Sequence, residues 1–134
     1  MGPRSRHLFL ALIVAQAAHS VEEYLTRLWE VLAPARFISG LVSSNLAVGF
    51  TVANVALISF AAWCYLARAR RGHASARGWA WFWATLETAN GVGHLALAAV
   101  RGAYFPGAAT APLLLLIAIW LAFTLARGDR LPPS

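Results

Sequence analysis

The sequence predicts an all-α fold, a bundle of four transmembrane helices, from its composition and from the placement of its charges. Of the 134 residues, 60% are hydrophobic and 12% are charged, about half the charged share of a soluble domain. The apolar stretches between the charges are each long enough to cross a hydrocarbon core of about 30 Å as a helix. We therefore expect one integral membrane domain over residues 1–134, with spans at about 7–26, 41–66, 79–100 and 106–126.

The first span begins near His7 and carries several ionisable residues in its second half. Arg4 and Arg6 precede it, and residues 15–17, Ala-Gln-Ala, resemble the cleavage site of a secretory signal peptide. A cleaved leader is therefore the alternative to a span. Apolar residues continue in a helical pattern beyond that site, which favours a retained span.

The other three spans are defined by the scarcity of charge. No charged residue occurs in residues 37–67 or in residues 102–126, which contain the second and fourth spans. Pro106 and Pro112 lie near the start of the fourth span, where helices tolerate proline. The third span contains Glu87 and His94, so its composition is closer to that of the first.

The basic residues indicate an orientation. The net charge is +6, and all eleven basic residues are arginine. Because cytoplasmic segments carry the excess of Lys and Arg, we expect an integral protein of the bacterial cytoplasmic membrane with both termini in the cytoplasm. The same clustering argues against a nucleic-acid partner. Eight arginines lie on the expected cytoplasmic side (Arg4, Arg6, Arg68, Arg70, Arg71, Arg77, Arg127 and Arg130) and three on the other (Arg27, Arg36 and Arg101).

Ionisable side chains are expected to meet between the first and third spans. A helix advances about 100° and 1.5 Å per residue, so residues three, four and seven apart share a face. A charge at the centre of a span costs about 3 kcal/mol, so such groups face each other or a water-filled cavity. Both polar faces lie at one depth, in the outer half of the bilayer. They consist of His19, Glu22 and Glu23 on the first span and of Glu87, Asn90 and His94 on the third.

The run from His19 to Glu23, His-Ser-Val-Glu-Glu, resembles the signature of the HXXEE-domain family of small integral membrane proteins. The run from Glu87 to His94 is similar to the second polar helix of that family, and the resemblance covers essentially the whole chain. It implies a site without implying a reaction. A four-span bundle with His, Glu and Asn inside also resembles, more distantly and in architecture alone, the EXPERA group, which includes sterol Δ8-Δ7 isomerases.

The preferred interpretation is a membrane-embedded acid–base enzyme that acts on a lipophilic small molecule. Two carboxylates one residue apart do not both ionise readily in a low dielectric, so we expect the Glu22 and Glu23 pair to hold one proton. A general acid of this kind suits isomerisation, cyclisation or epoxide opening, and it requires no metal or other cofactor. In this interpretation Glu22 or Glu23 donates the proton beside His19, and Glu87 or His94 takes it back with Asn90 orienting it.

Other polar and aromatic residues are candidates for contacts with the substrate. Aromatic rings can line an apolar pocket and stabilise a carbocation by cation–π attraction. The alternatives are interhelical hydrogen bonding for the asparagines and interfacial anchoring for the tryptophans. The candidates are Asn45, Asn54, Trp63, Trp83 and Trp120.

A metal-binding enzyme is the principal alternative function. Histidines and glutamates on facing helices hold Zn²⁺ or a di-iron centre in other bundles. The usual Glu-x-x-His and His-Glu-x-x-His spacings do not occur here, and the single cysteine excludes a Cys-rich metal site. The ligands in this alternative would be His19, Glu22, Glu23, Glu87 and His94.

Two further interpretations stay open. The polar residues could form a structural network that fixes the register of the helices, or the chain could be a non-enzymatic carrier or receptor for lipids or small molecules. Ala89, Gly93 and Ala96 lie on one face of the third span and could permit close packing in a homodimer.

Overall fold

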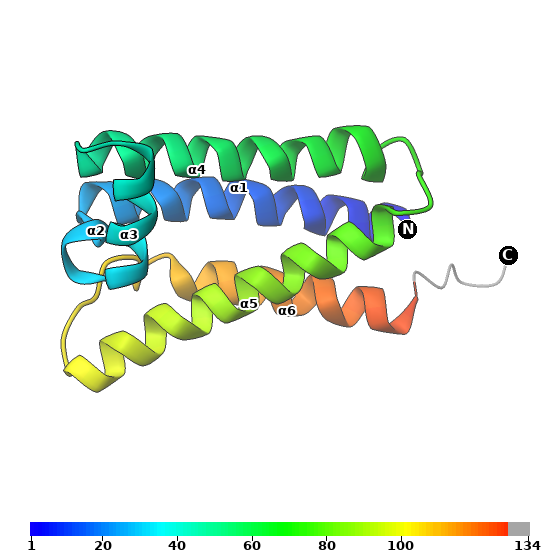
Figure 1. Cartoon of the computed structure of the whole chain (residues 1–134). Helices are drawn as coiled ribbons and strands as arrows, with labels where there is room; N and C mark the ends of the chain where they lie inside the picture. Colours follow the sequence, from blue (N-terminus) through cyan, green and yellow to red (C-terminus); the bar gives the residue numbers. More distant parts are fainter. Residues whose placement is uncertain (129–134) are drawn as a thin grey trace, which may run out of the picture.

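The computed structural model describes residues 1–128, which form helices joined by short turns (Figure 1). The predicted all-α class is confirmed, with no strand among these residues. Two short helices join the first long helix to the second at one end of the molecule. The long helices are α1 (Pro3–Leu25), α4 (Leu46–Trp63), α5 (Ala76–Arg101) and α6 (Ala111–Arg127), the short ones are α2 (Leu28–Val31) and α3 (Ala33–Val42), and α4 continues as the π-helical segment η1 (Cys64–Ala69).

Two helical segments are long and apolar enough to cross a membrane, which favours the predicted membrane location. They are Pro3–Leu25 and Leu46–Ala69. Helix α6 is apolar but has 17 residues, fewer than the roughly 20 that usually span a bilayer. Helix α5 has 26 residues but contains several polar and charged ones. A crossing by all four long helices is therefore part of the proposal below.

The second apolar stretch of the sequence forms two helices instead of one. Helix α3 ends at Val42, and the side-chain oxygen of Asn45 accepts hydrogen bonds from the backbone N–H groups of Ala47 and Val48 at 3.1 and 3.3 Å, which caps a new helix. A Cβ atom added at Gly49 would lie 2.0 Å from the carbonyl oxygen of Ser39. Glycine at this position therefore lets α3 pack directly on α4.

The two ends of the bundle differ in charge. The N-terminus, the turn after η1 and the end of α6 lie together at the right of Figure 1, while α2, α3 and the α5–α6 loop lie at the left. Seven of the eight arginines expected on the cytoplasmic side belong to segments at the first end, and Arg130 lies outside the described residues. Arg27, Arg36 and Arg101 belong to the opposite end.

Two apolar clusters leave a polar segment between them on both α1 and α5. On α1, residues from Phe9 to Ala15 belong to the larger cluster, and the smaller cluster begins with Leu28 just beyond the helix. On α5, residues 76–84 belong to the larger cluster, and Leu97 packs against the smaller one. On each helix, the predicted polar face lies between the residues of the larger cluster and those of the smaller cluster. The apolar packing on both sides thus sets the positions of the polar side chains.

Candidate functional site

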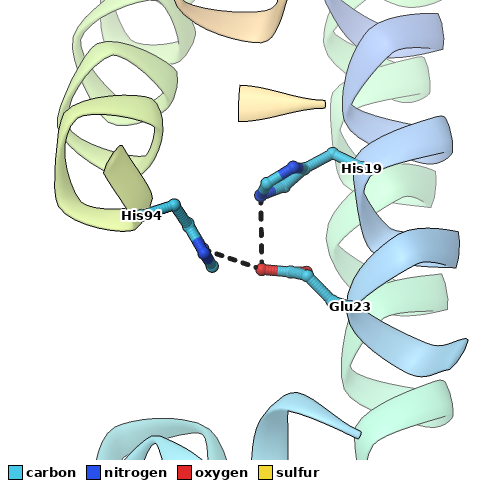
Figure 2. Close-up of side chains that lie close together, drawn as sticks. All are labelled: His19, Glu23 and His94. Carbon is cyan, nitrogen blue, oxygen red and sulfur yellow. Dashed lines mark ion pairs between the residues drawn. The ribbon is translucent and has the colours of Figure 1, made fainter. Parts of the chain in front are cut away.

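His19 and Glu23 from α1 meet His94 from α5 in the interior of the bundle (Figure 2). The Nε2 atoms of His19 and His94 lie 3.3 and 3.0 Å from the same Oε1 atom of Glu23. The centroids of the two imidazole rings are 4.7 Å apart, and the rings are nearly perpendicular at 87°. The exposed fractions of the three residues are 0%, 6% and 4% for His19, Glu23 and His94. This group, called the triad below, is shielded from water.

The backbone fixes which nitrogen of His94 carries a proton. Its Nδ1 atom lies 2.6 Å from the carbonyl oxygen of Pro106. A carbonyl oxygen can only accept, so Nδ1–H is the donor. In the neutral ring, Nε2 then carries a lone pair, and this is the atom that faces Glu23.

A chain of hydrogen bonds fixes His19 in the same way. Its Nδ1 atom lies 2.6 Å from Oγ1 of Thr110, whose hydroxyl group donates to Oε2 of Glu22 at 2.5 Å. Because that hydroxyl proton is already used, Nδ1–H of His19 donates to Thr110. The buried Nε2 atom of His19 has no hydrogen-bond partner among the described residues. In the neutral ring, its contact with Glu23 is therefore between two atoms that both carry lone pairs.

Glu22 faces away from Glu23 and binds the loop between α5 and α6. Its carboxylate accepts hydrogen bonds from the backbone N–H groups of Ala109 and Thr110 at 3.0 and 2.8 Å, from the Thr110 hydroxyl, and from the Tyr104 hydroxyl. Partial burial and the contact with Glu22 raise the pKa of Tyr104, so its phenol keeps the proton that it donates. The two carboxylates, expected to share one proton, thus have separate partners.

The same loop lies directly against both imidazole rings. Gly107 has a φ of 90°, a conformation that favours glycine. A Cβ atom at this position would lie 2.5 Å from Nδ1 of His94 and 2.8 Å from Cε1 of His19. The backbone at Gly107 therefore covers the triad so closely that no larger residue fits.

Comparison with protein families finds a match over most of the chain. The family model for proteins of unknown function with an HXXEE motif matches residues 10–121. The chain belongs to this family. No curated protein and no solved structure matches the chain, so no comparison supports the suspected likeness to the EXPERA group.

The structure gives the residues of the HXXEE motif different environments. His19 and Glu23, one helical turn apart, point into the bundle and belong to the triad. Glu22, between them on the helix surface, points to the α5–α6 loop. The motif therefore joins an interior cluster to the loop that covers it.

Glu87 and Asn90 belong to a second buried network, separate from the triad. The Nδ2 atom of Asn90 donates to Glu87 at 3.1 Å and to Gln16 at 3.4 Å. Gln16 donates to Ser20 at 3.1 Å, and Ser20 donates to Asn54 on α4 at 2.7 Å. This amide network joins three helices. Glu87, 1% exposed, lies at its end.

The remaining candidates divide between the interior and the surface. Trp83 is buried and lines a narrow crevice together with Phe9 and Glu87. Asn45, the cap of α4, is exposed. Trp63 is 42% exposed beside the guanidinium of Arg68, and Trp120 is 51% exposed beside that of Arg4. The structure does not bring Asn45, Trp63 or Trp120 to the triad.

Sequence reasoning missed the loop residues that orient the two histidines. These are Pro106 and Thr110, which were assigned to the start of the fourth span. Helix α6 begins only at Ala111. The Pro106-Gly107 dipeptide is a turn signal that could have placed a loop here. Nothing in the sequence indicates that this loop returns to Glu22 and His19.

Proposed function

We propose that this chain is a membrane-embedded metalloenzyme in which His19, Glu23 and His94 hold one divalent transition-metal ion and act on a lipophilic small molecule. One observation carries the proposal. Both histidines donate Nδ1–H to fixed acceptors, so in the neutral rings both Nε2 lone pairs and a carboxylate oxygen meet with no proton donor between them. Such a set of atoms needs a cation at its centre.

Protons satisfy this arrangement poorly. One added proton turns one histidine into a donor to Glu23 and leaves the other Nε2 atom facing an oxygen lone pair. Two added protons place two imidazolium ions against one carboxylate oxygen, with like charges on rings whose centroids are 4.7 Å apart and where at most 7% of any of the three side chains is exposed. A divalent ion instead accepts all three lone pairs.

The distances fit a small tetrahedral ion. Zn–N and Zn–O bonds of about 2.0 to 2.1 Å place neighbouring ligand atoms roughly 3.3 Å apart. The two His–Glu contacts measure 3.3 and 3.0 Å, and all candidate ligand atoms lie within 4.8 Å of one another. Ligand atoms at the wide end of this range would have to approach to roughly 3.3 Å when the ion binds. The Nδ1–H hydrogen bonds to Pro106 and Thr110 are the outer contacts that metal-bound histidines usually make.

The ligand set favours a catalytic ion. Two histidines and one glutamate leave a fourth position open, as in catalytic zinc sites, and two histidines and a carboxylate also hold Fe²⁺. When bound, such an ion polarises a substrate oxygen or activates a water molecule. Glu22 and Glu87 have other partners, which favours one ion over a di-iron pair. Since the triad is buried in an apolar bundle, a lipophilic substrate arriving from the membrane suits it best.

An acid–base enzyme without a metal is the second candidate. The observation in its favour is Glu87, a buried carboxyl group hydrogen-bonded to the neutral amide of Asn90. A carboxyl group in such surroundings can store a proton for transfer to a substrate.

In the proposed topology, all four long helices cross the bacterial cytoplasmic membrane with both termini in the cytoplasm. The charge difference between the two ends of the bundle supports it. In cells whose protein carries Cys64→Ala, an impermeant thiol reagent added outside should label Arg101→Cys and leave Arg70→Cys unlabelled. Labelling of Arg70→Cys and not of Arg101→Cys would contradict this orientation.

The metal proposal is tested by loading the purified protein with Zn²⁺, or anaerobically with Fe²⁺, and measuring bound metal after removal of the excess. We expect about one ion per chain, and its loss in His94→Ala and Glu23→Gln. Glu30→Gln is the matched control, since Glu30 is exposed and pairs with Arg27 at 2.7 Å. A wild-type protein without stoichiometric metal, or triad variants that retain it, would overturn the proposal.

A further inference from the structure

We infer that Glu22 is a positioning residue of the metal centre: it clasps the loop of residues 102–110 over the triad and, through Thr110, fixes the ring of His19. The inference rests on the proposed function, because it concerns the same site. It gives the remaining carboxylate of the HXXEE motif a role other than proton donation.

Glu22 receives four hydrogen bonds from this one loop. Two backbone N–H groups, of Ala109 and Thr110, and two hydroxyl groups, of Tyr104 and Thr110, donate to the two oxygens of Glu22. These donors enclose the Pro106-Gly107 turn in the sequence. Glu22 therefore binds the loop on both sides of the segment that touches the imidazoles.

The bound loop orients both histidines of the triad. The carbonyl oxygen of Pro106 and the hydroxyl oxygen of Thr110 are the acceptors that turn the Nε2 atoms of His94 and His19 toward Glu23. Gly107 lies against both rings. If the loop moved away, both histidines would lose their orienting partners and the triad would lose its cover.

The charge of Glu22 also suits a place beside a metal ion. A carboxylate that accepts from four donors is in its ionised form, because the hydrogen of a protonated oxygen would face the hydrogen of one of these donors. Glu22 and Glu23 together then balance the two positive charges of a divalent ion. In a bundle of low dielectric constant, a neutral assembly avoids the cost of an unpaired buried charge.

The hydrogen-bond chain from Glu22 through Thr110 to His19 also acts on the ligand itself. An outer carboxylate that accepts from the partner of a metal-bound histidine raises the basicity of that histidine and fixes its tautomer. Removing such an outer contact commonly lowers metal affinity by about 10- to 100-fold. A residue that merely joins a loop to a helix would not have this effect.

The experiment compares Zn²⁺ affinity, the rate of Zn²⁺ release to a chelator, and the absorption spectrum of the Co²⁺-loaded protein. We expect Glu22→Gln and Thr110→Val to weaken Zn²⁺ binding by about 10- to 100-fold, to speed release and to shift the Co²⁺ bands. Thr110→Ser retains the hydroxyl group and should restore wild-type values. Glu30→Gln controls for the loss of a carboxylate at the same end of the molecule.

The outcomes separate this inference from the function on which it depends. If the wild-type protein binds no metal, the proposed function is wrong. If the wild type binds metal and neither Thr110→Val nor Glu22→Gln changes affinity, release or spectrum, the clasp is wrong and the metal centre stands. Thr110→Val keeps the test decisive if Glu22→Gln fails to fold, because the Thr110 side chain does not cap α6.

Discussion

Two buried polar networks connect the same pair of helices, and they differ in how their hydrogen bonds are matched. In the amide network, each donor from Asn90 through Gln16 and Ser20 finds an acceptor, ending at Asn54. In the triad, the proton-bearing nitrogens of both histidines point away, and three lone pairs face one another. The first network is complete within the chain. In the second, the proposed ion would match the three lone pairs.

This difference shows why counting polar residues in a membrane helix does not locate a functional site. Both networks place carboxyl groups at positions that are costly in a membrane. The interhelical hydrogen bonds of a matched network offset that cost and fix the register of the helices. An unmatched one has no such compensation within the chain, which favours a bound ligand as its partner. The predictions below test whether the two networks are as separate as their contacts indicate.

Among substitutions outside the triad, the largest effect is expected from Gly107→Ala. The added Cβ atom would lie 2.5 Å from Nδ1 of His94, so the loop or both rings must move, and Zn²⁺ affinity should fall on the order of 100-fold. Gly102→Ala is the matched control, because Gly102 also has a positive φ, of 61°, and a Cβ there meets no atom within 4 Å. Equal losses of affinity in the two variants would mean that loop strain, and not contact with the triad, sets the affinity.

An intermediate effect, on stability alone, is expected from Asn90→Ala. It leaves Glu87 and Gln16 without a shared donor, which should cost about 1 to 3 kcal/mol of unfolding free energy and lower the melting temperature in detergent. Zn²⁺ affinity should stay at the wild-type value. Thr88→Ala is the control, since the Thr88 hydroxyl donates to Ala84 of its own helix. A large loss of Zn²⁺ binding in Asn90→Ala would show that the two networks are coupled.

The pattern of residues in the sequence was sufficient to predict the helical class and the meeting of α1 and α5. Helical spacing places His19 and Glu23 on one face, and their depth matches that of His94. Spacing could not show that Glu22 and Glu23 turn to different partners. That choice depends on the path of the α5–α6 loop. Gly102 and Gly107, which both have a positive φ, turn the loop, and the long-range hydrogen bond from the Ala109 N–H to Glu22 holds it against α1.

Helix boundaries were less predictable than helix positions. An uncharged stretch reads as one span, yet α3 and α4 are separated by the Asn45 cap. An apolar side chain is favourable both in one continuous helix and in two shorter ones, so hydrophobicity does not indicate where a helix ends. Short polar caps and turn glycines, which change composition very little, therefore decide where the backbone breaks.

The smallest effect is expected from Glu87→Gln. Glutamine has nearly the shape of glutamate, and its side-chain oxygen can still accept from Asn90, so the amide network stays matched. An amide is less costly than a carboxylate in an apolar interior, so the free energy of unfolding should be unchanged or slightly higher. Zn²⁺ stoichiometry and affinity should equal those of the wild type, whereas Glu23→Gln, the same change at the triad, should abolish binding. Metal analysis beside thermal unfolding of both variants in one detergent makes this comparison directly. If Glu87→Gln loses the ion as Glu23→Gln does, Glu87 is a ligand, the site extends across both networks, and the separation between a structural and a metal-binding network fails.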